Sequence, residues 1–490
     1  MRPFFIIYNC YICQKNNIMK RKYLFNLIFI YSAIVFAQTP CSSGMAGIYP
    51  CNNIDLMSNM TKTQLGGLLN AEFNDIWGWT DPLNNNEYAI IGLTSHTAFV
   101  NITNPISPIY LGKLPTATSN STWRDIKVYN NHAFIVSEAS NHGMQVFDLT
   151  RLRNVTSPQT FTSDAHYTGF GKCHNIAINE ATGYAYAIGS TTFSGGPHFV
   201  NIQNPVMPVA AGGYSAQDYS HDAHIVIYNG PDTQHVGKEI FFGANEDKVV
   251  VVDVTNKATP ILLSTFSYSN TSYTHQGWLT DDHKYFLAGD ELDESNFGFN
   301  TKTLIIDMTD LDAPVLKSNY FGVTPAIDHN GYTKGNDFYL ANYRAGLRLL
   351  DISSINAGTM NEIGFFDTYP TSNSNSFNGA WSVYPYFASG NIIISDIERG
   401  LFVVRKSAAL SNENFEKQSF SMHPNPSKYL TTITSNEIIT SVEVFNTIGQ
   451  NIKSYKNINS NDFEINTSEF TTGLYMVVVN KTISKKLIIE

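Results

Sequence analysis

A unit of about fifty residues occurs seven times in the middle of the chain. Each unit opens with an Asp, Asn or Gln just before a short strand, at Asp75, Asp125, Asn175, Asp222, Gln276, Asn330 and Asn378. Three further short strands follow in each unit, with no helical periodicity between them. Units that repeat at this period pack on their neighbours to build one continuous core. The pattern predicts an all-β fold, a seven-bladed β-propeller over residues 64–406.

The two ends of the repeat region predict how the ring closes. The seventh unit stops after its third strand, at Lys406. An extra strand, QLGGLLN at residues 64–70, precedes the first unit and is expected to supply the missing fourth strand of the last blade. Such an interlock removes an exposed strand edge. A row of seven independent sheets is the alternative, and it leaves far more edges uncovered.

Composition limits the class of partner. Charged residues make up only 15% of the chain and the formal net charge is −10, so the overall basic footprint of a nucleic-acid-binding protein is absent. The apolar fraction of 43% excludes wholesale disorder. The third strand of a unit usually ends in Asp or Asn before a turn, and such residues are expected to be structural, as at Asp148, Asp253, Asp307 and Asp351.

The first 37 residues are typical of a leader. A basic cluster at 20–22 is followed by an apolar stretch from Leu24 to Phe36 and by Val35 and Ala37, which fit the small-residue rule for cleavage before Gln38. We interpret residues 1–37 as a leader with a signal peptide and expect Met19 to be the true start; an extended leader is the alternative. No other apolar run reaches 18 residues, so no transmembrane span is expected.

The cysteines indicate one cross-link. Cys41 and Cys51 bracket a short Gly- and Pro-containing loop in the N-terminal segment 38–63, and outside the cytoplasm they are expected to form a disulfide. Two unpaired small apolar side chains are the alternative. Cys173 lies beside His174, but adjacent residues of a strand point to opposite faces, so a nucleophile pair is not expected.

The composition changes from Ser419 onward. Residues 419–490 contain alternating strands such as GLYMVVVN and do not continue the repeat. They predict a separate small antiparallel β-sandwich, joined to the propeller by a linker at 407–418.

Two family resemblances extend this interpretation. Residues 41–405 resemble the choice-of-anchor B family with its LVIVD-type propeller repeats, on stretches such as NDIWGWTDP, WRDIKVYNNHAFIVSEASNHGMQVFDLTRLR and NYRAGLRLLDIS. That resemblance implies a propeller and supplies no activity. Residues 419–490 resemble the type A sorting domain of the type IX secretion system of Bacteroidetes, on FSMHPNPSKYLTTIT, GLYMVVV and KKLIIE. Without the resemblance they would be interpreted as an accessory sandwich or adhesion module.

The sorting domain implies a route and a partner. The chain would cross the inner membrane by its signal peptide and the outer membrane through the type IX machinery, which would recognise residues 419–490 and remove them. The mature protein would then be secreted or held on the outer cell surface.

Four histidines share one position of the repeat. His174, His221, His275 and His329 each stand directly before the polar residue that opens a unit, in four consecutive blades. Loops that precede inner strands share one face of a propeller, so these imidazoles are expected near the channel mouth, with His224 close by. Neutral imidazole binds zinc, iron or copper. Metal binding and blade-to-blade hydrogen bonding are both open for these residues.

Charged residues are expected on the same face. Glu138, Asp290, Glu291 and Arg344 are the predicted ligand-binding residues. The fifth unit also carries a long loop, GDELDESNFGFNTK, whose carboxylates could hold calcium; a solvated acidic loop is the alternative. The tryptophans near the first strands are expected to pack between blades, with stacking on a sugar as the functional alternative; they are Trp77, Trp79, Trp123, Trp278 and Trp381.

These features favour a non-catalytic extracellular binding protein whose ligand is a glycan, a peptide or another protein. The alternative is an extracellular metal-dependent hydrolase or lyase that uses the histidines and a carboxylate, with zinc or calcium as the divalent metal. A purely structural envelope component is the third hypothesis. No HExxH or GxSxG motif is present and no catalytic residue can be assigned, which favours the binding protein.

Overall fold

The computed structural model describes residues 38–408, 420–447, 449–480 and 483–490. The chain forms two compact units, Met1–Arg405 and Lys406–Glu490. The predicted leader and signal peptide lie outside the described residues, as does most of the predicted linker.

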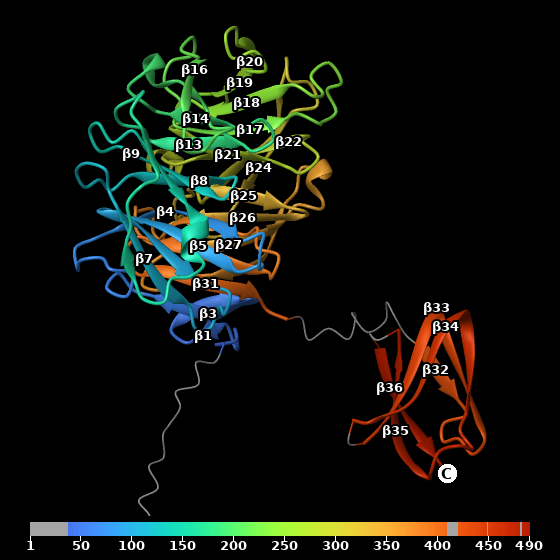
Figure 1. The fold of residues 1–490 in the computed structure, drawn as a ribbon. Coiled ribbons are helices and arrows are strands. Elements are labelled where there is room, and N and C mark those ends of the chain that lie inside the picture. The colour runs from blue at the N-terminus through green and yellow to red at the C-terminus, as the bar shows by residue number, and fades with distance from the viewer. Residues whose placement is uncertain (1–37, 409–419, 448, 481–482) are drawn as a thin grey trace, which may run out of the picture. The chain divides into compact units, whose positions relative to one another are not determined.

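Seven antiparallel sheets build the first unit, which confirms the seven-bladed β-propeller (Figure 1). From inner to outer strand, the first three blades are β4 (Phe73–Thr80), β5 (Glu87–Leu93), β6 (His96–Asn101), β7 (Ile109–Pro115); β8 (Arg124–Tyr129), β9 (His132–Ser137), β10 (Met144–Asp148), β12 (Ala165–Tyr167); and β13 (Asn175–Asn179), β14 (Tyr184–Ile188), β15 (His198–Asn201), β16 (Val209–Gly213).

The other blades follow the same order. They are β17 (Asp222–Ile227), β18 (Glu239–Ala244), β19 (Val249–Asp253), β20 (Ile261–Phe266); β21 (Thr274–Leu279), β22 (Tyr285–Asp290), β23 (Lys302–Asp307), β24 (Val315–Phe321); β25 (Gly331–Lys334), β26 (Asp337–Asn342), β27 (Gly346–Asp351), β28 (Asn361–Phe366); and β29 (Ala380–Tyr384), β30 (Asn391–Asp396), β31 (Gly400–Lys406), β3 (Ile54–Met60). A short helix, α1 (Asp293–Phe297), interrupts the fifth blade, and β11 (Gln159–Thr160) pairs in parallel with β7.

The ring is closed by β3, and the predicted closing strand at 64–70 is wrong. β3 is the outer neighbour of β31, so a strand that precedes the first blade in the sequence completes the last blade (Figure 1). Residues 64–67 form turns instead: the N–H of Gly67 donates to the carbonyl of Lys62 at 2.9 Å, and Gly66 has φ +74°. Paired glycines favour such turns over a strand. Segment 38–63 is therefore part of the propeller.

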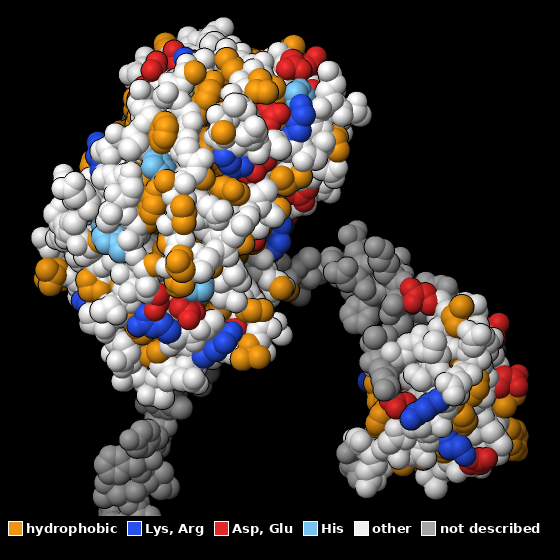
Figure 2. Space-filling model, turned by 45° about the horizontal axis from the view of Figure 1, so that its top comes forward, with side chains coloured by type: hydrophobic (Ala, Val, Ile, Leu, Met, Phe, Trp, Pro, Cys, Tyr) orange, Lys and Arg blue, Asp and Glu red, His pale blue; other side chains and the backbone are white. Residues whose placement is uncertain are grey.

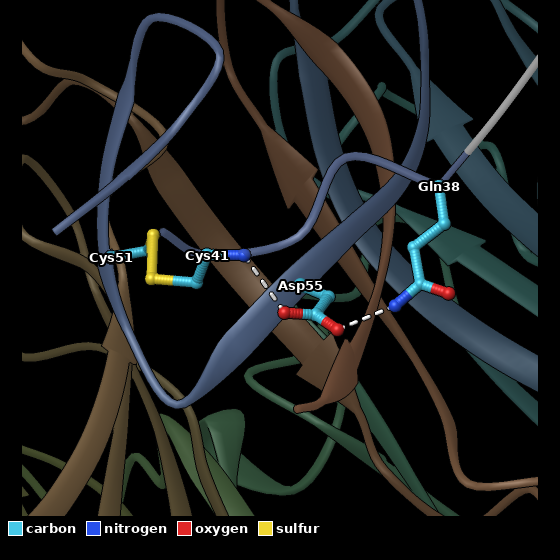
Figure 3. The surroundings of a disulfide bond; sticks show 4 residues. All are labelled: Gln38, Cys41, Cys51 and Asp55. Atoms are coloured by element: carbon cyan, nitrogen blue, oxygen red, sulfur yellow. Dashed lines mark hydrogen bonds between the residues drawn. A yellow bond between two sulfur atoms is a disulfide. The ribbon is translucent and has the colours of Figure 1, made fainter. Parts of the chain in front are cut away.

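The N-terminal segment is fastened by a disulfide (Figure 3). Cys41 and Cys51 are bonded, with their Cα atoms 5.9 Å apart. The backbone N–H of Cys41 donates to Asp55 Oδ1 at 2.8 Å, and the Gln38 amide donates to Asp55 Oδ2 at 2.5 Å. β1 (Met45–Ala46) and β2 (Tyr49–Asn52) form a hairpin between the cysteines, and β2 extends the sixth blade by pairing with β28. These contacts attach the segment before β3 both to β3 itself, through Asp55, and to the sixth blade, through β28.

The repeated polar position links neighbouring blades. Asp75 Oδ2 accepts from the backbone N–H of Ile126 at 3.3 Å, and Asp125 Oδ2 accepts from that of Ile176 at 3.2 Å. Each side chain thus holds the inner strand of the next blade, as the repetition predicts. The Asp residues that end third strands cap the following turns, as predicted, by accepting from Thr150, Thr255, Thr309 and Ser353 N–H groups.

Apolar side chains fill the spaces between blades. Phe99 of the first blade stacks on Phe147 of the second with ring centroids 4.5 Å apart, and both are fully buried. Trp79 lies in the same cluster, so this tryptophan packs between blades as expected. On the surface, Figure 2 shows acidic and basic side chains in small scattered groups among uncharged polar atoms, in keeping with the low charged fraction.

The second unit is a five-stranded all-β domain. Its strands are β32 (Phe420–His423), β33 (Leu430–Asn446), β34 (Asn451–Asn466), β35 (Gly473–Val479) and β36 (Ile483–Ile489). The first part of β33 pairs with β32 and its last part with β35, while β34 follows it along its length. Register shifts between Thr434 and Ser441 let this long strand bend around a core that includes Ile433, Val442 and Val477.

Candidate metal centre

The inner strands bring the four predicted histidines into one row at a mouth of the channel. His174–His221, His221–His275 and His275–His329 have ring centroids 4.1, 4.2 and 4.4 Å apart. We call this row the histidine mouth. It lines a cavity of about 20 Å³, which is room for a single water molecule or ion. The shared repeat position therefore predicts a real cluster.

Two of these histidines are oriented by the next blade. The Nδ1–H of His221 donates to the carbonyl of His275 at 3.1 Å, and the Nδ1–H of His329 donates to the carbonyl of Trp381 at 2.5 Å. This assignment of the tautomer follows from the carbonyl partners, because a carbonyl oxygen only accepts. It leaves the Nε2 lone pairs free. Metal-binding histidines commonly donate their other ring nitrogen in this way.

Glu291 supplies a carboxylate to the row. Its Oε2 lies 3.7 Å from His275 Nε2, and its Oε1 lies 3.5 Å from His329 Nε2. Two ligands bound to one tetrahedral zinc at about 2.0–2.1 Å stand about 3.4 Å apart. The three ligand atoms of His275, Glu291 and His329 all lie within 4.8 Å of one another. One metal ion could therefore be bound with little movement of these three side chains.

Tyr343 fixes Glu291 and was not predicted. Its hydroxyl donates to Glu291 Oε1 at 2.9 Å. In the sequence Tyr343 stands directly before Arg344, which is predicted to lie on this face, so Arg344 is the nearest signal that the sequence contains. A ligating carboxylate is normally held by such a hydrogen bond.

Burial keeps the imidazoles of His221, His275 and His329 neutral. Burial lowers the pKa of His329 to about 3 and holds the pKa values of His221 and His275 well below their usual range, with neighbouring histidines adding to the decrease at both. Burial also raises the pKa of Glu291 to about 7. Neutral imidazole is the form that binds metal.

One ring nitrogen of the row lacks a partner. His275 is 2% exposed, and its Nδ1 has no hydrogen-bond partner in the described part of the chain. A buried polar atom without a partner costs free energy, and an ion or water often supplies the missing contact.

His174 ends the row in a different pairing. Its Nδ1 lies 2.5 Å from Glu138 Oε1, and Lys172 lies 4.0 Å from the other oxygen of that carboxylate. The hydrogen bond from His174 holds the pKa of Glu138 below its usual range. Glu138 thus lies at the histidine mouth as predicted.

The other predicted ligand-binding residues are engaged elsewhere. Asp290 is fully buried, and its carboxylate accepts from the N–H groups of Ser272 and Tyr273 at 2.7 and 2.6 Å. Arg344 donates to Ser374 Oγ and to Asn378 Oδ1. Both hold loops of the propeller.

His224 does not join the histidine mouth, contrary to expectation. It lies on β17 two residues beyond Asp222, hence further along the inner strand. Its ring stacks on Trp278 with centroids 3.7 Å apart. The register of the strand, rather than proximity in sequence, decides which mouth a side chain faces.

A second acid–histidine group was not predicted. Asp232, His235 and Asp312 place ligand atoms within 4.8 Å of one another. Asp232 Oδ2 already accepts from the N–H of Leu311 at 3.0 Å and Oδ1 from that of Gln234 at 3.2 Å, so it holds two turns together. His235 Nε2 lies 3.1 Å from the Asp312 carboxylate. We interpret this group as a structural one that holds neighbouring loops together.

The acidic loop of blade five exposes its tip at residues 295–298 but turns its carboxylates inward, so the alternative of solvated carboxylates is wrong. Asp293 and Glu294 open α1 and are 0% and 1% exposed, and Asp328 is 1% exposed. Lys302 pairs with Asp293. Burial raises the pKa of Asp293 to about 6 and that of Glu294 to about 8, with Asp293 adding to the latter. Calcium binding here stays a prediction.

Glu294→Gln is expected to flatten the dependence of stability on pH. The folded state keeps the Glu294 proton up to about pH 8, whereas an unfolded chain loses it near the ordinary glutamate pKa of 4.5. The folded state therefore binds more protons between these pH values, and parental stability falls as pH rises through this window. We expect the variant to gain about 1–3 kcal/mol relative to the parent between pH 5 and pH 8.

Thermal or urea unfolding at the two pH values measures this gain, with the exposed Asp247→Asn as the control. Parallel pH profiles for parent and Glu294→Gln would contradict it. If calcium neutralises the loop instead, added calcium will stabilise the parent at pH 8 and have less effect on the variant.

Comparisons with known proteins identify the tail. Residues 421–490 match the family described as secretion system C-terminal sorting domain. The chain carries a type IX sorting domain. That domain directs it to the cell surface or to secretion, which confirms the predicted localisation. No helix among the described residues is long and apolar enough to cross a membrane.

No curated protein matches the sequence. Several solved structures are similar at low identity. PorZ, a surface component of the type IX secretion system of Porphyromonas gingivalis, shares 12% identity at a TM-score of 0.45, over 83% of this chain and 58% of its own. The β-propeller domain of Cps50 (Swd1) from Myceliophteria thermophila shares 9% at 0.44, over 66% and 94%. A protein from Lactobacillus plantarum shares 12% at 0.43, over 81% and 98%.

Proposed function

We propose that the chain is an extracellular binding protein whose propeller holds a divalent metal ion of the zinc type through His275, His329 and Glu291. The observation that carries the proposal is the approach of both Nε2 atoms to one carboxylate, at 3.7 and 3.5 Å. Two imidazoles and one carboxylate form a known zinc ligand set. His221, whose ring neighbours His275 and whose Nδ1 is engaged by a carbonyl, is available as a further nitrogen ligand.

The metal gives a fixed positive charge to a recessed mouth. Three protein ligands leave at least one coordination position for an outside donor. A carboxylate or hydroxyl group of a glycan, a peptide or another protein could occupy that position. The propeller itself supplies the rigid frame, since each inner strand is bonded to the next.

Two further features of the sequence support an extracellular role, and a third concerns the export partner. The likeness of residues 41–405 to the choice-of-anchor B family and the signal peptide at residues 1–37 both agree with an exported propeller. The type IX machinery would be the partner of residues 419–490.

Isothermal titration of the full chain with zinc, after removal of metal by a chelator, tests the proposal. We expect one ion per chain. Glu291→Gln and His329→Gln should each weaken binding at least tenfold, because each removes a ligand atom. Glu246→Gln should leave the affinity unchanged, because Glu246 is an exposed carboxylate beside Thr274 and supplies no ligand atom to the proposed site. Absence of stoichiometric zinc binding in the parent would refute the proposal.

Tyr343→Phe provides a finer measurement on the same site. It removes only the hydroxyl that donates to Glu291, so it should weaken zinc binding by about tenfold to a hundredfold without removing a ligand. Equal affinity in this variant would show that Glu291 is not held for metal binding.

A metal-dependent hydrolase or lyase is the second function that the geometry permits. The specific observation is that Glu138 and its hydrogen-bonded His174 lie at the end of the same row, where they could move a proton to or from a metal-bound group. Zinc-loaded protein with hydrolytic or lyase activity that is lost in Glu138→Gln while zinc stays bound would favour this function over binding alone.

A further inference from the structure

The channel ends opposite the histidine mouth in a larger cavity that no predicted site uses. This cavity measures about 440 Å³, within the range of small-molecule sites. A deeper cavity of about 190 Å³ shares four lining residues with it: Trp77, Glu180, His224 and Trp278. We call the two joined cavities the aromatic vestibule.

The strand period explains why aromatic side chains gather there. Residues two apart on a strand face the same side, so the residue two positions after each polar position also faces the channel. In the first six units that place is occupied by Trp77, Lys127, Ala177, His224, Trp278 and Tyr332. Tyr384 at the end of β29 and Tyr386 just beyond it complete the lining.

The rings form several walls rather than one flat platform. Trp77 and Tyr384 meet at 68° with centroids 5.1 Å apart, and Tyr384 and Tyr386 meet at 76° and 5.3 Å. Trp278 and Tyr332 meet at 73° and 4.9 Å. Rings at steep angles around one space present electron-rich faces from more than one direction, as aromatic cages for ammonium groups do.

The charges of the lining complement a cation. Glu180 and Asp281 are carboxylates of the vestibule, and no cationic side chain pairs with either in the part of the chain that the structure describes. The vestibule partly buries the Glu180 carboxylate, and this raises its pKa. Burial also lowers the pKa of His224 to about 3, so this imidazole adds no positive charge.

The lysines nearby do not neutralise the negative charge of Glu180 and Asp281. Lys127 is the one cation of the lining, and its ammonium lies 2.8 Å from Asp125 and 3.5 Å from Asp75. Lys334 donates to the carbonyl groups of Pro385 and Phe387 and is not part of the lining. Lys127 also lies 4.5 Å from the ring centroid of Trp77, so this ring face already stacks with a cation.

We propose that the aromatic vestibule binds a compact organic cation of the quaternary ammonium class. Such a group would contact Tyr384, Tyr386 and the face of Trp278 that His224 does not cover, and its charge would be balanced by Glu180 and Asp281. The site is separate from the histidine mouth, so it does not depend on the metal.

The test compares two probes of the same shape. Choline and 3,3-dimethylbutan-1-ol differ chiefly in that a charged nitrogen replaces a carbon atom. Binding to the full chain is measured by tryptophan fluorescence in the presence of a chelator, which keeps metal out of the measurement. We expect choline to bind at least tenfold more tightly than the neutral alcohol.

Glu180→Gln should weaken choline binding about threefold or more, because it removes one compensating charge from an exposed loop position and leaves the fold intact. The control Glu72→Gln changes an exposed carboxylate that is not part of the vestibule lining and should have no effect. Equal affinity for the two probes would overturn the proposal. So would binding of neutral sugars without binding of choline, or no change in Glu180→Gln.

Discussion

Lys127→Met is expected to lower the free energy of unfolding by about 3–5 kcal/mol, because it leaves buried carboxylates without their counter-charge. The Lys127 side chain is 10% exposed, and those of Asp125 and Asp75 are 9% and 3% exposed. Burial alone would lower the pKa of Lys127, but Asp125 and Asp75 hold it well above its usual range. The Lys127 ammonium thus links two inner strands, β4 and β8, at the centre of the propeller.

A double-mutant cycle separates this ion pair from the loss of packing. Asp125→Asn together with Lys127→Met removes both charges, so we expect the double variant to be more stable than the sum of the single effects by about 1–3 kcal/mol. Urea unfolding monitored by fluorescence gives the four free energies. A cost below about 1 kcal/mol for Lys127→Met would contradict the account, since an exposed ion pair costs no more than that.

Gly400→Ala is expected to be far more destabilising than Gly390→Ala, although both glycines lie in the seventh blade with positive φ. Their φ angles are +100° and +80°. A Cβ at Gly390 meets nothing within 4 Å, so this variant should cost only the backbone strain of about 1–2 kcal/mol. A Cβ at Gly400 would stand 2.1 Å from the carbonyl oxygen of Met60, at the end of β3.

The difference between these variants measures closure by β3. We expect Gly400→Ala to cost about 1–3 kcal/mol more than Gly390→Ala, because the backbone of β3 must move away from β31. Thermal unfolding of the two variants and the parent provides the comparison. Equal costs would mean that residues 54–60 do not lie against β31, and the closing strand would then have to be sought elsewhere.

The sequence predicts the number of blades because one physical requirement recurs in each. A polar side chain at the start of an inner strand can hold the next inner strand, and it therefore returns from unit to unit. The seventh unit departs from the pattern, because Asn378 lies before β29 and donates to Glu398 instead. The closing strand is not marked in this way. Both 54–60 and 64–70 are short and partly apolar. The paired glycines at 66 and 67 count against the second segment, but only the pairing with β31 identifies the first as the closing strand. Tertiary contacts decide such cases, because strand propensity depends on the neighbours.

The candidate site likewise combines features that the repeat predicts with features that only tertiary contacts decide. Histidines at one register position must meet at one mouth, so their row follows from the repeat. The roles of Asp290 and Glu291 do not, because these adjacent residues differ only in the direction that the chain takes after β22. Asp290 turns to the backbone of the preceding loop, while Glu291 reaches His275 and His329. Side chains that depend on loop paths, such as Tyr343, are equally hidden from sequence.

Anomalous diffraction from crystals of the zinc-loaded protein tests the proposed metal site at the histidine mouth. We expect one strong peak at the zinc edge, about 2.0–2.2 Å from Nε2 of His275, Nε2 of His329 and an oxygen of Glu291. A peak at Asp232, His235 and Asp312 with none at the histidine mouth, or no peak in the propeller, would contradict it.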